Sequence, residues 1–299
     1  MERTDITGCA SRRTALFLRE NHRGTVLMAN SAGIYLDLEG QILLLCDESW
    51  GMVPNGIGIA DFPEAAGRLA LQPGDKVVCH GGALQAAGQW IRVEETEEYI
   101  SWGNRVFPDR CARGRECLRQ RKQGLAPLVR PLLEQADMEG DNPWCTLALP
   151  RLEKLMEGLQ EEKEDAIDSG VKTLLGLGPG LTPSGDDVLC GLLWGLRHSS
   201  LEGRNGVRIL VDAVCRESGE LTHPVSAAYL KAIARGEVFG RLAKAWSFLT
   251  GAEENGLHQL LEVGSSSGGD MLLGLLLAAE MLRMEDEKNG GTDCTGTVG

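Results

Sequence analysis

The sequence predicts an α+β protein, in which a small β-rich barrel or sandwich domain precedes a mainly α-helical domain. Two observations carry this prediction. In the first ~105 residues, short runs of branched apolar residues alternate with turns, as is typical of strands. Beyond them, apolar residues recur at positions i, i+3 and i+4, as is typical of amphipathic helices. We therefore expect domains at 1–105 and 106–286, and a disordered polar tail at 287–299.

The expected strands follow one another at intervals of about ten residues, a spacing that favours a small barrel or sandwich. A Glu-Gly pair at 39–40 predicts a hairpin turn between two of them. The strand-like runs are residues 24–30, 33–38, 41–47, 55–62, 71–82 and 88–100.

The helical half contains six segments with a helical apolar period, and the boundary between the halves is expected within 101–111. A charged stretch at 161–168 fits a solvated helix face. The six segments are residues 152–167, 207–215, 226–236, 239–249, 257–264 and 270–287.

Composition narrows the class of protein. The formal net charge of −13 argues against nucleic acid or an anionic membrane as the main partner. No apolar run reaches the ~18 residues that a membrane-spanning helix needs, and the start of the chain lacks the apolar core of a signal peptide. The nine cysteines are scattered without a CxxC pair, which favours reduced thiols and a cytoplasmic location.

One sequence motif occurs twice in the helical half. Residues 182–193 read TPSGDDVLCGLL and residues 265–276 read SSSGGDMLLGLL. They share the Ser-Gly pair, the following Asp, a Leu and the Gly-Leu-Leu ending. Each copy predicts a loop that leads into a buried helix, and the glycines Gly191 and Gly274 allow these two helices to cross closely with their N-termini together.

Two helix N-termini that face each other would form a small anion pocket, because free backbone N–H groups and the helix dipole both attract negative charge. Glycines would let a ligand approach the backbone, and hydroxyl groups would donate further hydrogen bonds. Thr222 and Ser226, from the segment before another helix, would line the same pocket. The candidate substrate-binding residues are Gly178, Gly180, Thr182, Gly185, Thr222, Ser226, Ser265, Ser266, Ser267, Gly268 and Asp270.

The carboxylates in the motifs would repel a bare anion. Asp187 and Asp270 occur in both copies and fit helix caps, whereas Asp186 has Gly269 as its counterpart and is freer for chemistry. We take Asp186, Asp187 and Ser184 as candidate catalytic residues. No cofactor is certain, although Mg²⁺ held by Asp186, Asp187 and Asp270 is possible. The plainer alternative is that both motifs only cap two packed core helices.

Three segments together resemble the AllH family. They are GLGPGLTPSGDD at 176–187, the Thr-x-x-x-Ser-x-x-Tyr-Leu element at 222–230, and GSSSGGDMLLG at 264–274. They stand in the family's order and cover most of the helical half. The sequence departs from the family pattern at Ser265, where a His is common, so this position is not expected to be an obligate acid or base.

The resemblance implies a subunit of oxamate carbamoyltransferase, a transferase of anaerobic allantoin (purine) degradation. That enzyme converts oxalurate and phosphate into oxamate and carbamoyl phosphate, and it works as a hetero-oligomer with AllF-like and AllG-like partner subunits. The expected ligands are therefore small anions that carry an amide or a phosphate. Neither motif contains an Arg or Lys, so the positive charge for a phosphate must come from backbone N–H groups, from another part of the chain, from a partner or from a metal.

Two alternatives to a catalytic subunit stay open. One is a non-catalytic assembly or ligand-sensing subunit of the same complex. The other is a stand-alone Mg²⁺-dependent enzyme that acts on a small phosphate or amide, with Asp186, Asp187 and Asp270 near the metal. The first would keep some turnover when the pocket is lost, and the second would be active without partners and inhibited by a chelator.

Overall fold

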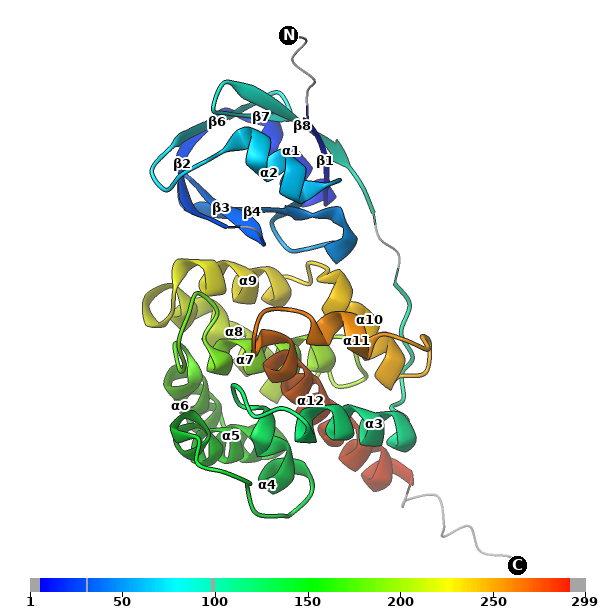
Figure 1. Ribbon diagram of the computed structural model, residues 1–299. Helices are drawn as coiled ribbons and strands as arrows, with labels where there is room; N and C mark the ends of the chain where they lie inside the picture. Colours follow the sequence, from blue (N-terminus) through cyan, green and yellow to red (C-terminus); the bar gives the residue numbers. More distant parts are fainter. Residues whose placement is uncertain (1–5, 31, 98–99, 291–299) are drawn as a thin grey trace, which may run out of the picture. The chain divides into compact units, whose positions relative to one another are not determined.

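The computed structural model describes residues 6–30, 32–97 and 100–290, and the chain divides into two compact units. The barrel unit comprises Met1–Tyr99 and Glu237–Arg241, and the helical unit comprises Ile100–Gly236 and Leu242–Gly299 (Figure 1). The predicted α+β class, with a small β-barrel before a mainly helical region, is confirmed.

The barrel unit is a closed barrel of eight strands in the order β1-β5-β4-β3-β2-β6-β7-β8. The pairs β1–β8 and β4–β5 are parallel and the others are antiparallel. The parallel pair β1–β8 closes the barrel, so no strand is left with an unpaired edge. The strands are β1 (Ile6–Ala10), β2 (His22–Ala29), β3 (Gly33–Leu38), β4 (Gln41–Asp47), β5 (Gly56–Ile59), β6 (Lys76–His80), β7 (Ala83–Ala86) and β8 (Gln89–Glu95).

The predicted hairpin turn at 39–40 is confirmed between β3 and β4. Glu39 and Gly40 both have positive φ angles, of 56° and 89°, and Leu38 pairs with Gln41 across the two-residue loop. Positive φ at both central residues gives a turn whose twist matches that of the flanking strands. Asp37 Oδ1 accepts a hydrogen bond of 2.7 Å from the Gly40 N–H, which holds the turn.

The strand pattern missed two helices of the barrel unit, α1 (Arg12–Arg19) and α2 (Phe62–Leu69), as well as a 3-10 turn, η1 (Glu48–Trp50). Both helices contribute to the barrel core, through Leu18 and Phe62, which are almost fully buried. These helices are two turns long, so their apolar period is too short to stand out from that of the adjoining strands.

The helical unit has its predicted helices at slightly shifted bounds. The segment 152–167 is not one helix: α5 ends at Glu161 and α6 begins at Glu164, because Glu162 adopts a left-handed conformation with φ 55°. The helices are α3 (Pro108–Arg119), α4 (Val129–Leu133), α5 (Pro143–Glu161), α6 (Glu164–Leu174), α7 (Ser184–Arg197), α8 (Asn205–Leu221), α9 (Pro224–Ala234), α10 (Gly240–Leu249), α11 (Leu257–Leu261) and α12 (Ser267–Gly290), with a 3-10 turn η2 (Ala126–Leu128).

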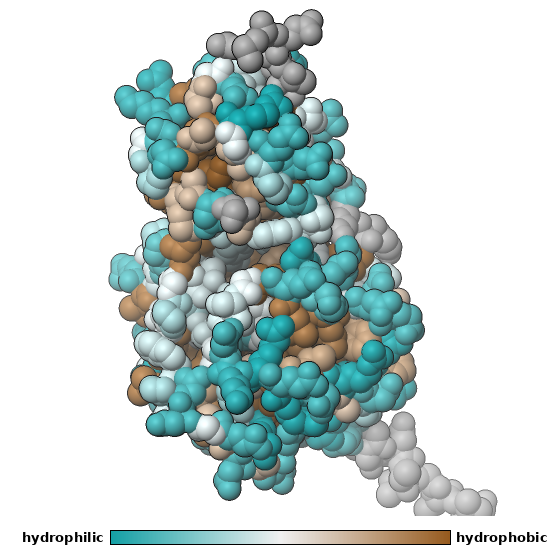
Figure 2. Space-filling model, in the orientation of Figure 1, coloured by the Kyte–Doolittle hydropathy of each residue, from teal (hydrophilic) through white to brown (hydrophobic). Residues whose placement is uncertain are grey.

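Helix α12 continues to Gly290, so it includes the first residues of the predicted tail, and residues 291–299 lie outside the described residues. Hydrophilic side chains cover most of the face of the helical unit that is seen in Figure 2, with smaller hydrophobic areas between them. None of the helices within the described residues is both long and apolar enough to cross a membrane.

Candidate ligand site at two paired helix N-termini

Helices α7 and α12, which carry the two copies of the repeated motif, make the most extensive contact between helices in the chain. They cross at the predicted glycines. A Cβ atom on Gly191 would lie 2.0 Å from the carbonyl oxygen of Met271, and one on Gly274 would lie 2.1 Å from that of Val188. Val188 and Met271 occupy equivalent places in the two copies, so the crossing is approximately two-fold symmetric.

The loops before the two helices repeat this symmetry. A Cβ atom on Gly185 would meet the carbonyl oxygen of Leu174 at 2.2 Å, and one on the equivalent Gly268 would meet that of Leu260 at 2.0 Å. In each copy, therefore, the helix start is packed against the end of the preceding helix, α6 or α11, at a distance that only glycine allows. The two motifs are one local structure built twice.

The N-termini of α7 and α12 lie together, as the sequence predicts. The hydroxyl groups of Thr182 and Ser267 are 3.1 Å apart and join the two loops by a hydrogen bond. The residue before α7 is Pro183, which makes no side-chain cap, so Ser184 is the first residue of the helix and not its cap. Its hydroxyl instead forms a hydrogen bond to Asp270 of the other motif.

Asp186 is fully buried and bound to its own chain. Its Oδ1 accepts a hydrogen bond of 2.9 Å from the Gly176 N–H. The hydroxyls of Thr222 and Ser226 also donate to this carboxylate. Burial raises the pKa of Asp186, and these three hydrogen bonds lower it. The structure thus brings Thr222 and Ser226 to the first motif, as predicted, but they contact Asp186 and are held by it.

Asp270 is also fully buried, and it binds a different segment of the chain. Its Oδ1 accepts a hydrogen bond of 2.6 Å from the Leu125 N–H, and the backbone of Ala126 also donates to this carboxylate. It therefore does not serve as a cap of its own helix. Burial raises the pKa of Asp270 to about 7, against the effect of these bonds and of the Ser184 and Ser266 hydroxyls.

Asp187 belongs to the first motif, and its carboxyl group interacts with that of Asp270 in the second motif. Its side chain is buried, and both burial and the negative charge of Asp270 raise its pKa well above the ordinary range. The hydroxyls of Ser267 and Thr182 act in the opposite direction. The raised pKa favours the protonated form of Asp187, which reduces the repulsion between the two buried groups.

The predicted site residues fall into a buried and an accessible group. The three aspartates, Ser184, Gly185, Ser226 and Gly268 are buried and form the interior of the motif pair. Thr222 is half-buried beside Asp186, and Gly178, also half-buried, has a φ of 123°. A ligand from solvent would first meet the accessible group, which consists of Gly180, Thr182, Ser265, Ser266 and Ser267.

Sequence reasoning did not find the positive charge next to this site. Residues Gln120 to Gln123, which follow α3, line a cavity of about 320 Å³ together with Ser265 and Ser266. This loop contains Arg121 and Lys122. The available signal was the basic run Arg-Gln-Arg-Lys at 119–122, but it lies more than 140 residues before the motif that it meets in space.

The aspartates do not form a shared metal centre. Among residues 6–30, 32–97 and 100–290, no three His, Cys, Asp or Glu side chains are grouped closely enough to hold a metal ion. Asp186 and Asp270 instead accept hydrogen bonds from N–H groups of separate loops, at Gly176 and Leu125. A Mg²⁺ ion bound jointly by the three carboxylates is therefore not supported by this arrangement.

A small barrel and a helical unit with a duplicated Ser-Gly-x-Asp junction define an α+β protein whose accessible hydroxyls lie over paired helix N-termini. The family model that matches this chain is the oxamate carbamoyltransferase subunit AllH, over residues 174–279. That range contains all three segments on which the resemblance rests, so the matched part of the helical unit is similar to this family. No solved structure matches the chain.

Proposed function

We propose that this chain is a subunit of an oxamate carbamoyltransferase in allantoin degradation, and that it binds a small anionic amide or phosphate at the paired motifs. The observation that carries the proposal is the hydrogen bond of 3.1 Å between Thr182 and Ser267. It joins the two helix N-termini at a partly accessible place. Ser265 and Ser266 lie beside it, and the carboxylates of both motifs are buried beneath.

The chemistry of the reaction fits such a place. A phosphate oxygen attacks the ureido carbonyl carbon of oxalurate, the carbon–nitrogen bond breaks, and the nitrogen takes up a proton to leave as oxamate. Negative charge builds on the carbamoyl oxygen during the attack. Hydroxyl groups and the N-termini of α7 and α12 would bind the carboxylate or stabilise this charge, because both present hydrogen-bond donors.

We assign the aspartates a positioning role in this proposal. Asp186 holds the turn at Gly176 and the segment with Thr222, and Asp270 holds the loop at Leu125. Each therefore fixes one wall of the site without facing solvent. Ser184 binds Asp270 across the motif pair in the same way. The accessible hydroxyls of Thr182, Ser266 and Ser267 are the groups that would touch the ligand.

The burial of all three aspartates also favours a second candidate function. A motif pair with no accessible acid or base is suited to binding, so this chain would sense or hold the substrate while another subunit completes the reaction. In either case the partners are other subunits of the carbamoyltransferase, of the AllF-like and AllG-like types.

The test is calorimetric titration of the chain, alone and in the assembled complex, with oxamate. Thr182→Val and Ser267→Ala each remove one hydroxyl, and we expect each to weaken binding about tenfold, the effect of one lost hydrogen bond to a charged group. Thr173→Val is the matched control, because Thr173 lies on the surface of α6 and its hydroxyl donates to backbone carbonyls of the same helix.

Unchanged oxamate binding in both motif variants would refute the site. Turnover of the complex then separates the two functions. If the chain is catalytic, Ser184→Ala abolishes turnover and Thr182→Val lowers it while the complex stays assembled. If it only senses the substrate, these variants lose the response to oxamate and keep residual turnover.

A further inference from the structure

We propose that the loop Gln120–Gln123 and the hydroxyls of Ser265 and Ser266 form a binding site for a phosphate dianion, either free phosphate or the phosphoryl group of an acyl phosphate. This inference rests on the proposed function for the identity of the substrate. The loop would supply the positive charge that both motifs lack. A phosphate bound there would lie beside the second motif.

The lining of the cavity fits this ligand. Arg121 and Lys122 contribute positive charge, Gln120 and Gln123 contribute amides, and Ser265 and Ser266 contribute hydroxyls. No carboxylate belongs to this lining. Arginine and lysine bind phosphate oxygens by charge-assisted hydrogen bonds, and amide and hydroxyl groups complete the coordination. The start of α12, at Ser267, adds the positive end of a helix dipole.

The basic side chains of this cavity remain available to a ligand. Lys122 is exposed, and in the described part of the chain neither Lys122 nor Arg121 pairs with a carboxylate. Arg121 donates one hydrogen bond of 2.8 Å, to the carbonyl oxygen of Leu261. That bond uses one Nη2 donor and fixes the guanidinium, so its remaining donors stay free.

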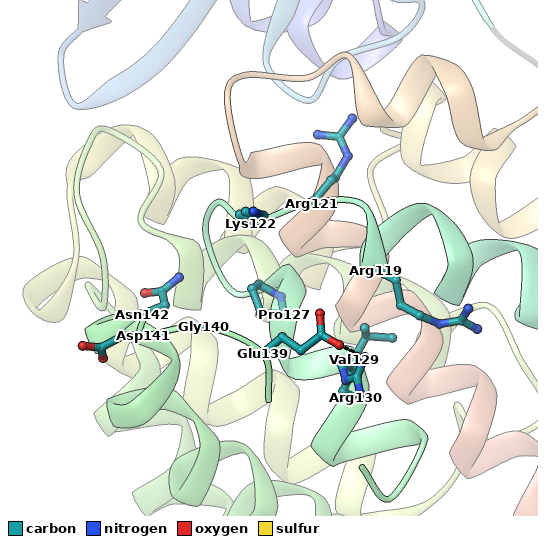
Figure 3. A pocket seen from close by; sticks show the side chains of 10 residues that line it. All are labelled: Arg119, Arg121, Lys122, Pro127, Val129, Arg130, Glu139, Gly140, Asp141 and Asn142. Carbon is teal, nitrogen blue, oxygen red and sulfur yellow. Dashed lines mark hydrogen bonds and ion pairs between the residues drawn. The ribbon is translucent and has the colours of Figure 1, made fainter. Parts of the chain in front are cut away.

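The neighbouring cations differ in this respect. Arg121 and Lys122 also line a second cavity of about 250 Å³, whose lining further includes Arg119, Arg130 and Glu139 (Figure 3). Arg130 pairs with Glu139, and Arg119 pairs with Glu116 and Glu134. In Figure 3, Arg121 points away from Arg119. The uncompensated charge therefore belongs to Arg121 and Lys122.

The loop is held in place by the second motif itself. Gly124 has a φ of 60°, and a Cβ atom there would lie 2.4 Å from Asp270 Oδ1. The same oxygen binds the Leu125 N–H, while the carbonyl oxygen of Gly124 accepts a bond of 2.8 Å from Asn142 Nδ2. Buried Asp270 thus fixes the backbone that carries the two cations, which reduces the entropy lost when a ligand binds.

The difference between the two motif copies explains why the site lies at the second one. Asp186 of the first copy corresponds to Gly269 of the second. A Cβ atom on Gly269 would already lie 3.4 Å from Arg121 Cδ, so a larger side chain would displace the arginine. Where the first copy places a carboxylate, the second copy leaves room for a guanidinium.

The experiment is calorimetric titration of the chain, alone and in the assembled complex, with inorganic phosphate, carbamoyl phosphate and oxamate. The variants are Lys122→Gln and Arg121→Gln, and Lys154→Gln is the control, because it removes one exposed positive charge elsewhere in the helical unit. We expect phosphate affinity to fall at least about tenfold in each of the first two variants, and to stay unchanged in the control.

The three ligands separate the possible outcomes. Loss of both phosphate and carbamoyl phosphate binding, with oxamate binding retained, supports the site; if only carbamoyl phosphate is affected, the site is specific for the acyl phosphate. Phosphate affinities that match the control, or no phosphate binding to the wild-type chain in either form, overturn it. Oxamate binding that depends on Thr182 and Ser267 would still support the proposed function in that case, so the two proposals fail separately.

Discussion

The two copies of the repeated motif fold alike and differ in what they hold. In both, a glycine packs the helix start against the end of the preceding helix, and a second glycine permits the crossing of α7 and α12. The first copy has Asp186, which binds the turn at Gly176 and the hydroxyl of Thr222. The second has Gly269 at that place, and the side chain of Arg121 lies next to it.

This comparison separates the residues that build the junction from those that give it chemistry. The shared glycines and the shared aspartates, Asp187 and Asp270, lie inside and preserve the geometry. The unshared position holds the negative carboxylate of Asp186 in the first copy, whereas in the second copy Gly269 leaves the positive side chain of Arg121 beside the motif. The two copies can therefore present different charges to one ligand.

The largest expected effect is at the shared helix crossing. Gly191→Ala places a methyl group 2.0 Å from a backbone oxygen of α12, and neither backbone can yield without separating the helices. We expect the free energy of unfolding to fall by at least about 3 kcal/mol, or the protein not to fold. Chemical denaturation measures the effect. Gly203→Ala is the control, since its Cβ atom would meet nothing within 4 Å; equal stability of the two variants would contradict the close crossing.

The unshared position should give the next effect. Asp186→Ala leaves the Gly176 N–H and the Thr222 hydroxyl without their acceptor. We expect a loss of about 2–3 kcal/mol in the free energy of unfolding, because these bonds to a charged group are lost and the buried Ser226 hydroxyl also loses its acceptor. Asp186→Asn keeps one acceptor oxygen and should lose less. If Asp186→Ala were as stable as the wild-type chain, the carboxylate would not be holding these segments.

The sequence alone predicts the scaffold of this site well. The strand pattern, the turn at 39–40 and the repeated motif lead to the barrel, its hairpin and the paired helices, because these depend on local periodicity and on residues such as glycine whose backbone preference is strong. The closeness of Gly191 to Gly274 also follows, since two similar helices with a glycine at the same place can approach there.

The surroundings of the site could not be predicted in this way. The partners of Asp186 and Asp270 lie on loops far away in sequence, and the basic loop at Arg121 is brought to Ser265 by tertiary packing. No periodicity encodes such contacts. An acidic motif by itself fits a metal site, a helix cap or a loop clamp equally well, and only the neighbours decide among them.

The shared aspartates predict a pH dependence of stability. In the unfolded chain an Asp carboxyl ionises near pH 3.9, whereas the pKa of Asp270 in the folded chain is about 7. Between these values the folded chain keeps a proton that the unfolded chain has lost. Stability therefore falls as the pH rises through this window, by roughly 1.4 kcal/mol per pH unit, and this loss is complete above the folded pKa.

The Asp270→Asn variant isolates this contribution. Its amide oxygen can still accept the Leu125 N–H, but it does not ionise, so the decline in stability between pH 5 and pH 7 should become shallower by about 2 kcal/mol. Urea denaturation at several pH values measures it. A residual decline should remain, because the pKa of Asp187 is raised as well. Parallel stability curves for the variant and the wild-type chain would show that Asp270 is ionised throughout.

The smallest effect concerns the hydrogen bond between Thr182 and Ser267, which joins the two copies at their accessible end. Thr182→Val and Ser267→Ala each remove a partner of the hydrogen bond of 3.1 Å between the loops. A double-mutant cycle on the free energy of unfolding should give a coupling of about 1 kcal/mol, the usual net value of a neutral hydrogen bond.

Thr182→Val with Ser199→Ala is the control pair, since Ser199 bonds to Leu196 and Leu201 near the far end of α7 and should show no coupling. A coupling near zero for Thr182 and Ser267 would mean that the helix crossing alone holds the N-termini together. A coupling near 1 kcal/mol would mean that a ligand must compete with this bond, so that oxamate binding would weaken the link between the motifs as it formed.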